Sequence, residues 1–450
     1  MIASLHFRTL WRQRRAIAGT LLACMIVLTL VRLAASTINP EIFPSSTLTG
    51  IIAFTAAFLL VPDVDYRQQR TLAVLLVLGL VLMGYGYQHG AHFLWVDVLS
   101  RNTLLLSMLL SVSFLKLITL PKNLTTLVNL PRGRSAFRNT LISVALFGSV
   151  INLSAPIVIA DRLHAERKIN FFTARSIIRV FTACACWSPF FAGTAVVLTY
   201  VENVRLSLIV ISGFPFLLLT VVAVYFLARR YDDDELADFR GFPLQAGSLW
   251  VPAVLAIMVM LAYGTVPSFS ILGSIACCAL ALTVTTLLLR KGGASTLKTL
   301  THFVRNETPR SVNEVTLFLA AGVLATGLIG LVDIGVITPP LQSFTTVNAA
   351  QVLAVMTLIA ACGIHPVIQI SGLTPILLAV NPPPTLLALT FLFAWSLGTC
   401  ASPLSGTNLV FQGRYDISAL KLAVRNWAYV GMMYCIAVGL LFLHARFFLN

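Results

Sequence analysis

The chain has 450 residues, of which 58% are hydrophobic and only 10% charged, and its formal net charge is +15 at pH 7. A soluble domain carries roughly 25% charged residues, so this composition excludes a soluble protein of this size. Apolar runs of about 20 residues, the length of a transmembrane helix, recur along the chain. Because these runs do not alternate in polarity, a barrel of transmembrane strands is disfavoured. The sequence predicts an all-α polytopic membrane protein.

The first apolar run, residues 16–36, follows four arginines within residues 8–15. Such a start could belong to a signal peptide, but a run of about 20 residues with Arg32 near its end favours an uncleaved anchor. We expect residues 1–45 to contain a cytoplasmic segment and the first transmembrane helix.

Lysine and arginine are not spread evenly: 27 of the 31 basic residues lie in seven groups between alternate apolar runs. The positive-inside rule then places all seven groups in the cytoplasm, together with the N-terminus. We expect a bacterial inner membrane protein with no nucleic-acid partner, because the charge is explained by topology. The groups lie within residues 8–15, 67–70, 116–138, 162–179, 229–240, 290–310 and 414–425.

Residues 46–228 are predicted to form a first repeat. The segment at about 133–162 has basic residues at both ends, so a full crossing would leave one cluster outside. We therefore expect a re-entrant hairpin that opens to the cytoplasm and bends at Asn152–Pro156. The complete spans of this repeat are expected at about 46–62, 71–88, 101–120, 177–200 and 206–228.

A linker at 229–246 separates the two halves of the chain. It contains the acidic run Asp232–Glu235. This run could be a cation site, but a solvated linker is favoured because acidic loop residues weigh little on topology and nothing else converges on them.

Residues 247–450 are predicted to form a second repeat. The apolar stretch 349–380 is too long for one span and too short for two, and it is interrupted at Gly363–Pro366. We expect a second hairpin here, which opens to the outside. With the spans of both repeats and the first helix, about 11 transmembrane helices are predicted. Those of the second repeat lie at about 247–264, 268–290, 314–334, 384–412 and 425–447.

The two halves match in order: three spans, a hairpin and two spans, with opposite orientation. A short motif supports this match, because Ser188–Val197 recurs as Ser402–Val410, one residue shorter between its Ser-Pro and Gly-Thr pairs. Each copy lies in the span after its hairpin. The sequence therefore predicts an inverted-topology repeat, with binding sites near the bilayer midplane.

Proline removes a backbone donor, and a nearby Gly-Thr pair allows an unwound turn, so four helix interruptions are expected. Half-helix N-termini suit an anion, whereas carbonyl, Ser, Thr and Asn oxygens suit Na⁺. Ordinary kinks are the alternative. A Na⁺ site is predicted near Asn152, Ser154, Thr194, Thr407 and Asn408. The candidate substrate- or ion-binding residues are Asn152, Ser154, Ser188, Gly193, Thr194, His365, Gln369, Ser371, Thr374, Ser402, Ser405, Gly406, Thr407 and Asn408.

His365 lies at the second predicted bend. Histidine titrates near neutral pH, so this side chain could carry a coupled proton or donate to an anion. A hydrogen-bonded structural histidine is an equal alternative.

The motif Ser405–Val410 is similar to the Gly-Thr-rich, Asn-containing loop in a broken span of the ion transporter superfamily, whose best-described members are divalent-anion:sodium symporters. The two opposed hairpins and the extra N-terminal span also resemble that family. The resemblance implies elevator transport of an anionic metabolite by hairpins and broken helices that move against a dimeric scaffold. The expected partners are therefore a small anion, membrane lipid and a second copy of the chain.

An integral membrane enzyme, a channel and a lipid or glycan-precursor translocator are the competing functions. An enzyme would need a nucleophile with its base, clustered carboxylates or metal ligands at membrane depth, and no such pattern is evident. Cys184 and Cys186 could hold a soft metal, but packing is favoured because no second thiol pair or histidine flanks them. We expect a transporter coupled to Na⁺ or H⁺, without a cofactor.

Overall fold

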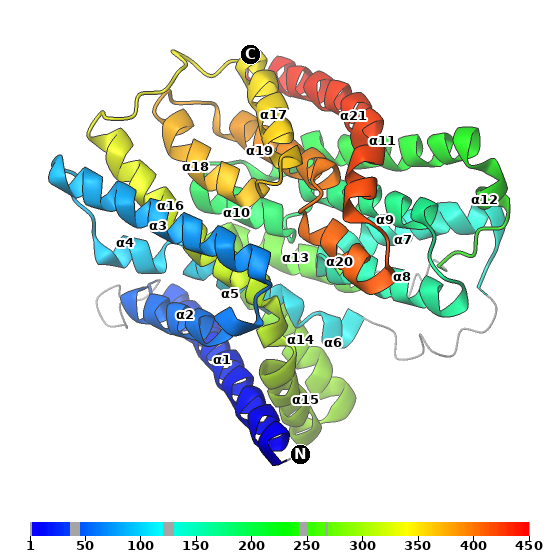
Figure 1. Ribbon diagram of the computed structural model, residues 1–450, viewed down its shortest axis with the longest axis horizontal. Helices are drawn as coiled ribbons and strands as arrows, with labels where there is room; N and C mark the ends of the chain where they lie inside the picture. Colours follow the sequence, from blue (N-terminus) through cyan, green and yellow to red (C-terminus); the bar gives the residue numbers. More distant parts are fainter. Residues whose placement is uncertain (1, 37–45, 120–129, 243–249, 266–268, 450) are drawn as a thin grey trace. The chain divides into compact units, whose positions relative to one another are not determined.

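The computed structural model describes residues 2–36, 46–119, 130–242, 250–265 and 269–449, and its regular elements are helices (Figure 1). Within those ranges no strand is formed, and an isolated β-bridge joins Arg132 to Arg240. The prediction of an all-α protein is confirmed. Lys122 of the third basic group lies outside the described residues, as do positions 37–45 and 243–249 of the predicted N-terminal segment, linker and following span.

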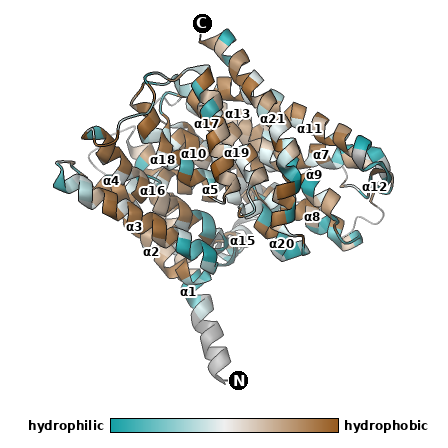
Figure 2. Cartoon of the chain, turned by 45° about the horizontal axis from the view of Figure 1, so that its top comes forward, coloured by the Kyte–Doolittle hydropathy of each residue, from teal (hydrophilic) through white to brown (hydrophobic). Residues whose placement is uncertain are grey.

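Nine helical segments in the described part of the chain are long and apolar enough to cross a membrane. The chain is therefore a multi-pass membrane protein. Figure 2 shows hydrophobic residues along most of helices α2 and α3. Two expected spans are not among the nine: 177–200 is interrupted, and the described helix of 247–264 has 16 residues. The nine segments are Gln13–Ala35, Ser46–Asp63, Tyr66–Gln88, Trp95–Thr119, Leu206–Arg230, Ile271–Lys291, Gly293–Asp333, Pro384–Tyr415 and Ala419–Phe448.

The chain folds into two compact units, and each takes helices from both halves of the sequence. Both predicted bends and both predicted broken spans fall in unit 2. The compact units are thus distinct from the sequence repeats at 46–228 and 247–450, since each repeat contributes to both units. Unit 1 comprises residues 1–119, 253–340 and 371–379, and unit 2 comprises residues 120–252, 341–370 and 380–450.

In unit 1, glycines allow α3 and α16 to pack closely. A Cβ on Gly79 would lie 2.9 Å from the backbone nitrogen of Leu324, and one on Gly327 would lie 2.8 Å from the carbonyl oxygen of Gly79. Small residues bring membrane helices together in this way. Unit 1 contains α1 (Ile2–Ala35), α2 (Ser46–Leu60), η1 (Val61–Asp63), α3 (Tyr66–Gln88), α4 (Trp95–Ser100), α5 (Thr103–Ser113), α6 (Lys116–Thr119), most of α13 (Trp250–Thr265), α14 (Ile271–Lys291), α15 (Gly293–Asn306), η4 (Thr308–Ser311) and α16 (Val312–Asp333).

Helix α4 precedes the span expected at 101–120, which is itself divided into α5 and α6. Between α4 and α5, Nε of Arg101 donates to Oγ1 of Thr326 at 3.1 Å, and Nδ2 of Asn102 donates to the carbonyl oxygen of Phe318 at 2.6 Å. The interruption therefore lets two polar side chains bind α16. The sequence did not predict α4, because the span was expected to begin at residue 101.

Helix α19 forms the centre of unit 2: every residue from Thr385 to Ala401 is buried. It packs against α9, α17 and α21. Unit 2 contains α7 (Gly133–Ile151), α8 (Ser154–Glu166), α9 (Phe171–Ala183), η2 (Cys184–Cys186), α10 (Ala192–Tyr200), α11 (Leu206–Tyr231), α12 (Asp233–Ala237), α17 (Thr346–Ala361), the first part of α18 (Pro366–Leu378), α19 (Pro384–Ala401), α20 (Gly406–Tyr415) and α21 (Ala419–Phe448).

Candidate functional site

The first predicted bend joins α7 to α8, which pack against each other. Asn152 adopts a positive φ of 51° at this bend. Its side chain donates through Nδ2 to the carbonyl oxygen of Phe190 and accepts through Oδ1 from the backbone nitrogen of Ala192, both at 3.0 Å. One asparagine thus ties the tip between α7 and α8 to the first broken span.

The first broken span is interrupted between α9 and α10, around Ser188-Pro189. The hydroxyl of Ser188 donates to the carbonyl oxygen of Ser149 on α7 and accepts from the backbone nitrogen of Phe190 at 3.2 Å. Thr194, six residues after Ser188, donates to the Ser188 carbonyl oxygen at 2.7 Å. Side chains therefore satisfy the backbone groups that the break would leave unpaired.

The second broken span repeats these interactions between α19 and α20. The Ser402 hydroxyl accepts from the backbone nitrogen of Leu404 at 3.3 Å, and Asn408 Nδ2 donates to the Ser402 carbonyl oxygen at 2.8 Å. Ser405 caps α20 by accepting from the Asn408 backbone nitrogen at 3.3 Å. Asn408 lies six residues after Ser402, as Thr194 does after Ser188. The hydrogen bonds therefore match Thr194 with Asn408. The sequence motif, in which the two Gly-Thr pairs are aligned, had instead matched Thr194 with Thr407.

The second predicted bend joins α17 to α18 at residues 362–365. Gly363 has a φ of +99°, and a Cβ there would lie 2.7 Å from Cδ1 of Leu404 in the second break. Gln369 on α18 donates through Nε2 to the carbonyl oxygen of Ile364 at 2.9 Å. The tip between α17 and α18 thus contacts the second break, as the tip between α7 and α8 contacts the first.

Trp395 connects the first break to the second tip. A Cβ on Gly193 would lie 3.0 Å from the Trp395 indole, so glycine is needed here for close packing. The His365 ring meets Trp395 edge-on at 5.5 Å between centroids. Its Nδ1 accepts from the backbone nitrogen of Val367 at 3.2 Å, which supports the structural interpretation of this histidine.

Two buried amide oxygens in unit 2, Oδ1 of Asn408 and Oε1 of Gln369, have no hydrogen-bond partner. Such oxygens are suited to a small cation. Close to Asn408 in sequence, Gly406 begins α20, and a Cβ added there would meet open space. The start of a ten-residue helix favours negative charge. The second break therefore offers an accessible helix N-terminus and an unpaired amide oxygen.

The remaining candidates contribute less. Ser154 is half-buried at the start of α8, and Thr407 is buried in the first turn of α20. Ser371 and Thr374 are buried on α18, in the part that belongs to unit 1, so the structure does not group them with the breaks.

No family model matches the chain, and no curated protein matches it. The resemblance to the ion transporter superfamily therefore rests on this chain's own residues.

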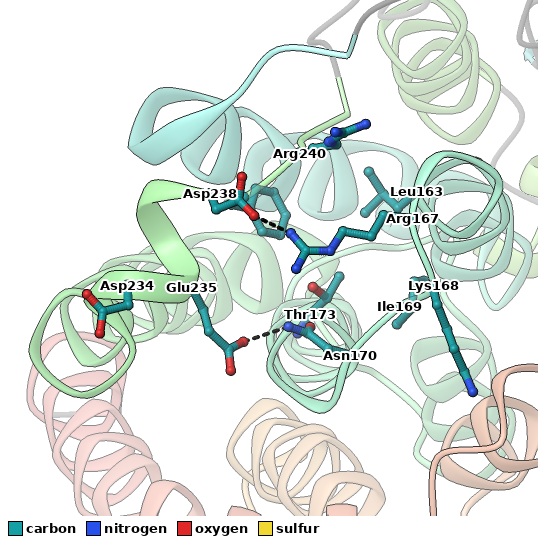
Figure 3. A pocket seen from close by; sticks show the side chains of 11 residues that line it. Leu163, Arg167, Lys168, Ile169, Asn170, Thr173, Asp234, Glu235, Asp238 and Arg240 are labelled. Carbon is teal, nitrogen blue, oxygen red and sulfur yellow. Dashed lines mark hydrogen bonds and ion pairs between the residues drawn. The ribbon is translucent and has the colours of Figure 1, made fainter.

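The acidic linker is not merely solvated, because arginines converge on it. Asp232 pairs with Arg175 and Asp233 with Arg134, each at 2.8 Å. A cavity of about 240 Å³ lies here, and Figure 3 shows Arg167 reaching Asp238 and Asn170 reaching Glu235. The acidic run forms the start of α12 and joins it to the ends of α7 and α9. Sequence reasoning missed this role because the partners are far apart in the chain. The cavity is lined by Leu163, Arg167, Lys168, Ile169, Asn170, Thr173, Asp234, Glu235, Asp238, Phe239 and Arg240.

A bidentate ion pair joins α8 to α20: Arg414 donates to the two carboxylate oxygens of Asp161 at 2.7 and 2.6 Å. Their side chains are 54% and 39% exposed. We expect Asp161→Asn to lower the free energy of unfolding by less than about 1 kcal/mol, since exposed pairs contribute little. Thermal melts at low and high salt check this. A larger loss that salt does not reduce would contradict it.

Proposed function

We propose that this protein is a secondary active transporter of a small anion, coupled to Na⁺ or H⁺ and related to the ion transporter superfamily. The anion binds at the N-terminus of α20, and the coupling cation at the unpaired Oδ1 of Asn408 beside it. We place the protein in a bacterial inner membrane with its N-terminus in the cytoplasm.

The observation that carries this proposal is the start of α20. Gly406 exposes its backbone to open space, and Asn408, which is fully buried, keeps Oδ1 without a partner. A buried unpaired acceptor costs free energy unless a ligand satisfies it. A site of this kind binds both signs of charge through backbone and amide groups.

The organisation of unit 2 supports an inverted repeat and an elevator mechanism. Unit 2 gathers both tips and both breaks, and the breaks share the same hydrogen bonds from Thr194 and Asn408. We propose that α7–α8 and α17–α18 are re-entrant hairpins of opposite orientation, that unit 2 carries the site across the membrane, and that the protein acts as a homodimer.

Reconstitution into proteoliposomes tests the function. Under inward Na⁺ or H⁺ gradients we expect at least one of lactate, succinate, citrate, sulfate and phosphate to accumulate above its equilibrium level. Collapse of the gradient should release it. A chain that accumulates none of these anions under either gradient contradicts the coupled-importer proposal, and movement of a lipid probe instead would favour a translocator.

The site itself is tested by Gly406→Ala and Gly406→Leu, with Gly413→Ala and Gly413→Leu as matched controls. Both glycines lie on α20, and a Cβ at either meets open space. We expect all four variants to melt close to the wild type, whereas uptake falls at least about tenfold only in Gly406→Leu, because its side chain covers the helix N-terminus. Equal uptake by the two leucine variants would show that the anion does not bind at the N-terminus of α20.

A further inference from the structure

Arg179 on α9 is a buried charge that the sequence did not single out. The sequence grouped it with the cytoplasmic cations of residues 162–179, but its side chain lies in the interior of unit 2 and is only 6% exposed. Among the Lys, Arg, Asp and Glu side chains that the structure describes, no other is buried. Lys116 and Glu314, which lie at the starts of α6 and α16, are only half-buried.

The partners of Arg179 are neutral. Nε donates to Oδ1 of Asn426 at 2.8 Å, and a terminal nitrogen lies 3.5 Å from the carbonyl oxygen of Arg425. The guanidinium lies 4.4 Å from the ring centroid of Tyr429. None of the ion pairs among the described residues includes Arg179. An arginine keeps its proton in proteins, so its positive charge stays without a carboxylate beside it.

Burial of an unpaired charge destabilises a protein, so a buried arginine without an ion-pair partner is a candidate for a functional role. The network of Arg179 ends at the second break. Asn426 donates to the carbonyl oxygen of Cys400 at 3.5 Å, and the Cys400 thiol lies 3.0 Å from Oγ1 of Thr182, one turn after Arg179 on α9. Cys400 is in the last turn of α19, two residues before Ser402. The charge is therefore fixed to the helix that ends at the candidate site.

We propose that Arg179 gives unit 2 a fixed positive charge that the transported anion neutralises. This inference rests on the proposed function and adds the source of anion selectivity. The empty site is left with an excess positive charge, which a bound anion reduces. The backbone and amide groups of the breaks then orient the anion, while Arg179 attracts its charge through the low-dielectric interior.

The test compares Arg179→Gln and Arg179→Lys with Arg175→Gln, a control one turn earlier on α9. Glutamine retains a donor for Asn426 but removes the charge. Without ligand, we expect Arg179→Gln to melt at a higher temperature than the wild type, because an uncompensated charge is gone. Arg175→Gln should melt lower, since Arg175 is paired with Asp232.

Uptake and melting then separate the two proposals. Arg179→Gln should lose at least about tenfold in uptake of whichever of lactate, succinate, citrate, sulfate or phosphate the wild type accumulates, whereas Arg179→Lys should keep most of it. A lower melting temperature for Arg179→Gln, or undiminished uptake by it, overturns the role of Arg179. If the wild type accumulates no anion, the proposed function fails by itself, and the melting comparison still shows whether the charge is uncompensated.

Discussion

Gly213→Ala is expected to lower the free energy of unfolding by about 3 kcal/mol, a large effect for one methyl group. Gly213 lies on α11, where the helix crosses the first break. A Cβ at this position would lie 1.8 Å from the carbonyl oxygen of Cys186 and 2.7 Å from its carbonyl carbon. Both are backbone atoms, so no side-chain rotation relieves the clash. Either α11 or η2 must shift, and η2 positions the first break.

Thermal unfolding of the purified protein in detergent measures this loss. Gly431→Ala and Gly439→Ala are matched controls, because both glycines lie on the membrane helix α21 and a Cβ at either meets open space. We expect the controls to melt within a few degrees of the wild type. A Gly213→Ala protein as stable as these controls would show that α11 does not pack against Cys186 as described.

Asn152→Ala is expected to reduce uptake at least about tenfold and to lower the free energy of unfolding by about 2 kcal/mol, since two hydrogen bonds are lost. The Phe190 carbonyl and the Ala192 amide would lose the side chain that binds both. The tip between α7 and α8 would then be free to separate from the first break. Alanine is also disfavoured at the positive φ of this residue.

Two comparisons isolate the hydrogen bonds from the backbone. Asn152→Gly accepts the positive φ, so it should recover about 1 kcal/mol relative to Asn152→Ala without restoring uptake. Asn203 also has a positive φ, of 57°, but lies exposed in the connection between α10 and α11. Asn203→Ala should therefore show the backbone effect alone and retain uptake. Full uptake by Asn152→Gly would mean that transport does not need the two hydrogen bonds by which Asn152 joins the tip to the first break.

The positions of the helix breaks could be predicted from the sequence because they depend on local covalent chemistry. Pro366 begins α18, Gly363 takes a positive φ before it, and Ser-Pro pairs mark both broken spans. Proline lacks a backbone donor and glycine lacks a Cβ, whatever surrounds them. The short helix α4, which precedes the span expected at 101–120, was not predicted, because no Pro or Gly marks its end.

The candidate site could be predicted only in part. The sequence named Asn152, Ser188, Thr194 and Asn408, and all four make hydrogen bonds at tips or breaks. It could not show that Thr194 and Asn408 serve the same carbonyl position. This structural equivalence depends on which carbonyl each side chain reaches. The second motif is one residue shorter, so an alignment of the two Gly-Thr pairs does not place Thr194 opposite Asn408.

By itself the sequence determined that this is a helical membrane protein, and where the two tips and the two Ser-Pro breaks lie, because hydropathy and the chemistry of Pro and Gly act over a few residues. The tertiary structure alone decided which helices form each unit, which oxygens stay unpaired, and that Arg179 is buried with no carboxylate of the described residues paired to it. These properties arise from contacts between residues far apart in the chain, such as Arg179 and Asn426, which are 247 positions apart. Whether a charged side chain is buried depends on the helices packed around it, so the neighbouring residues in the sequence do not predict it.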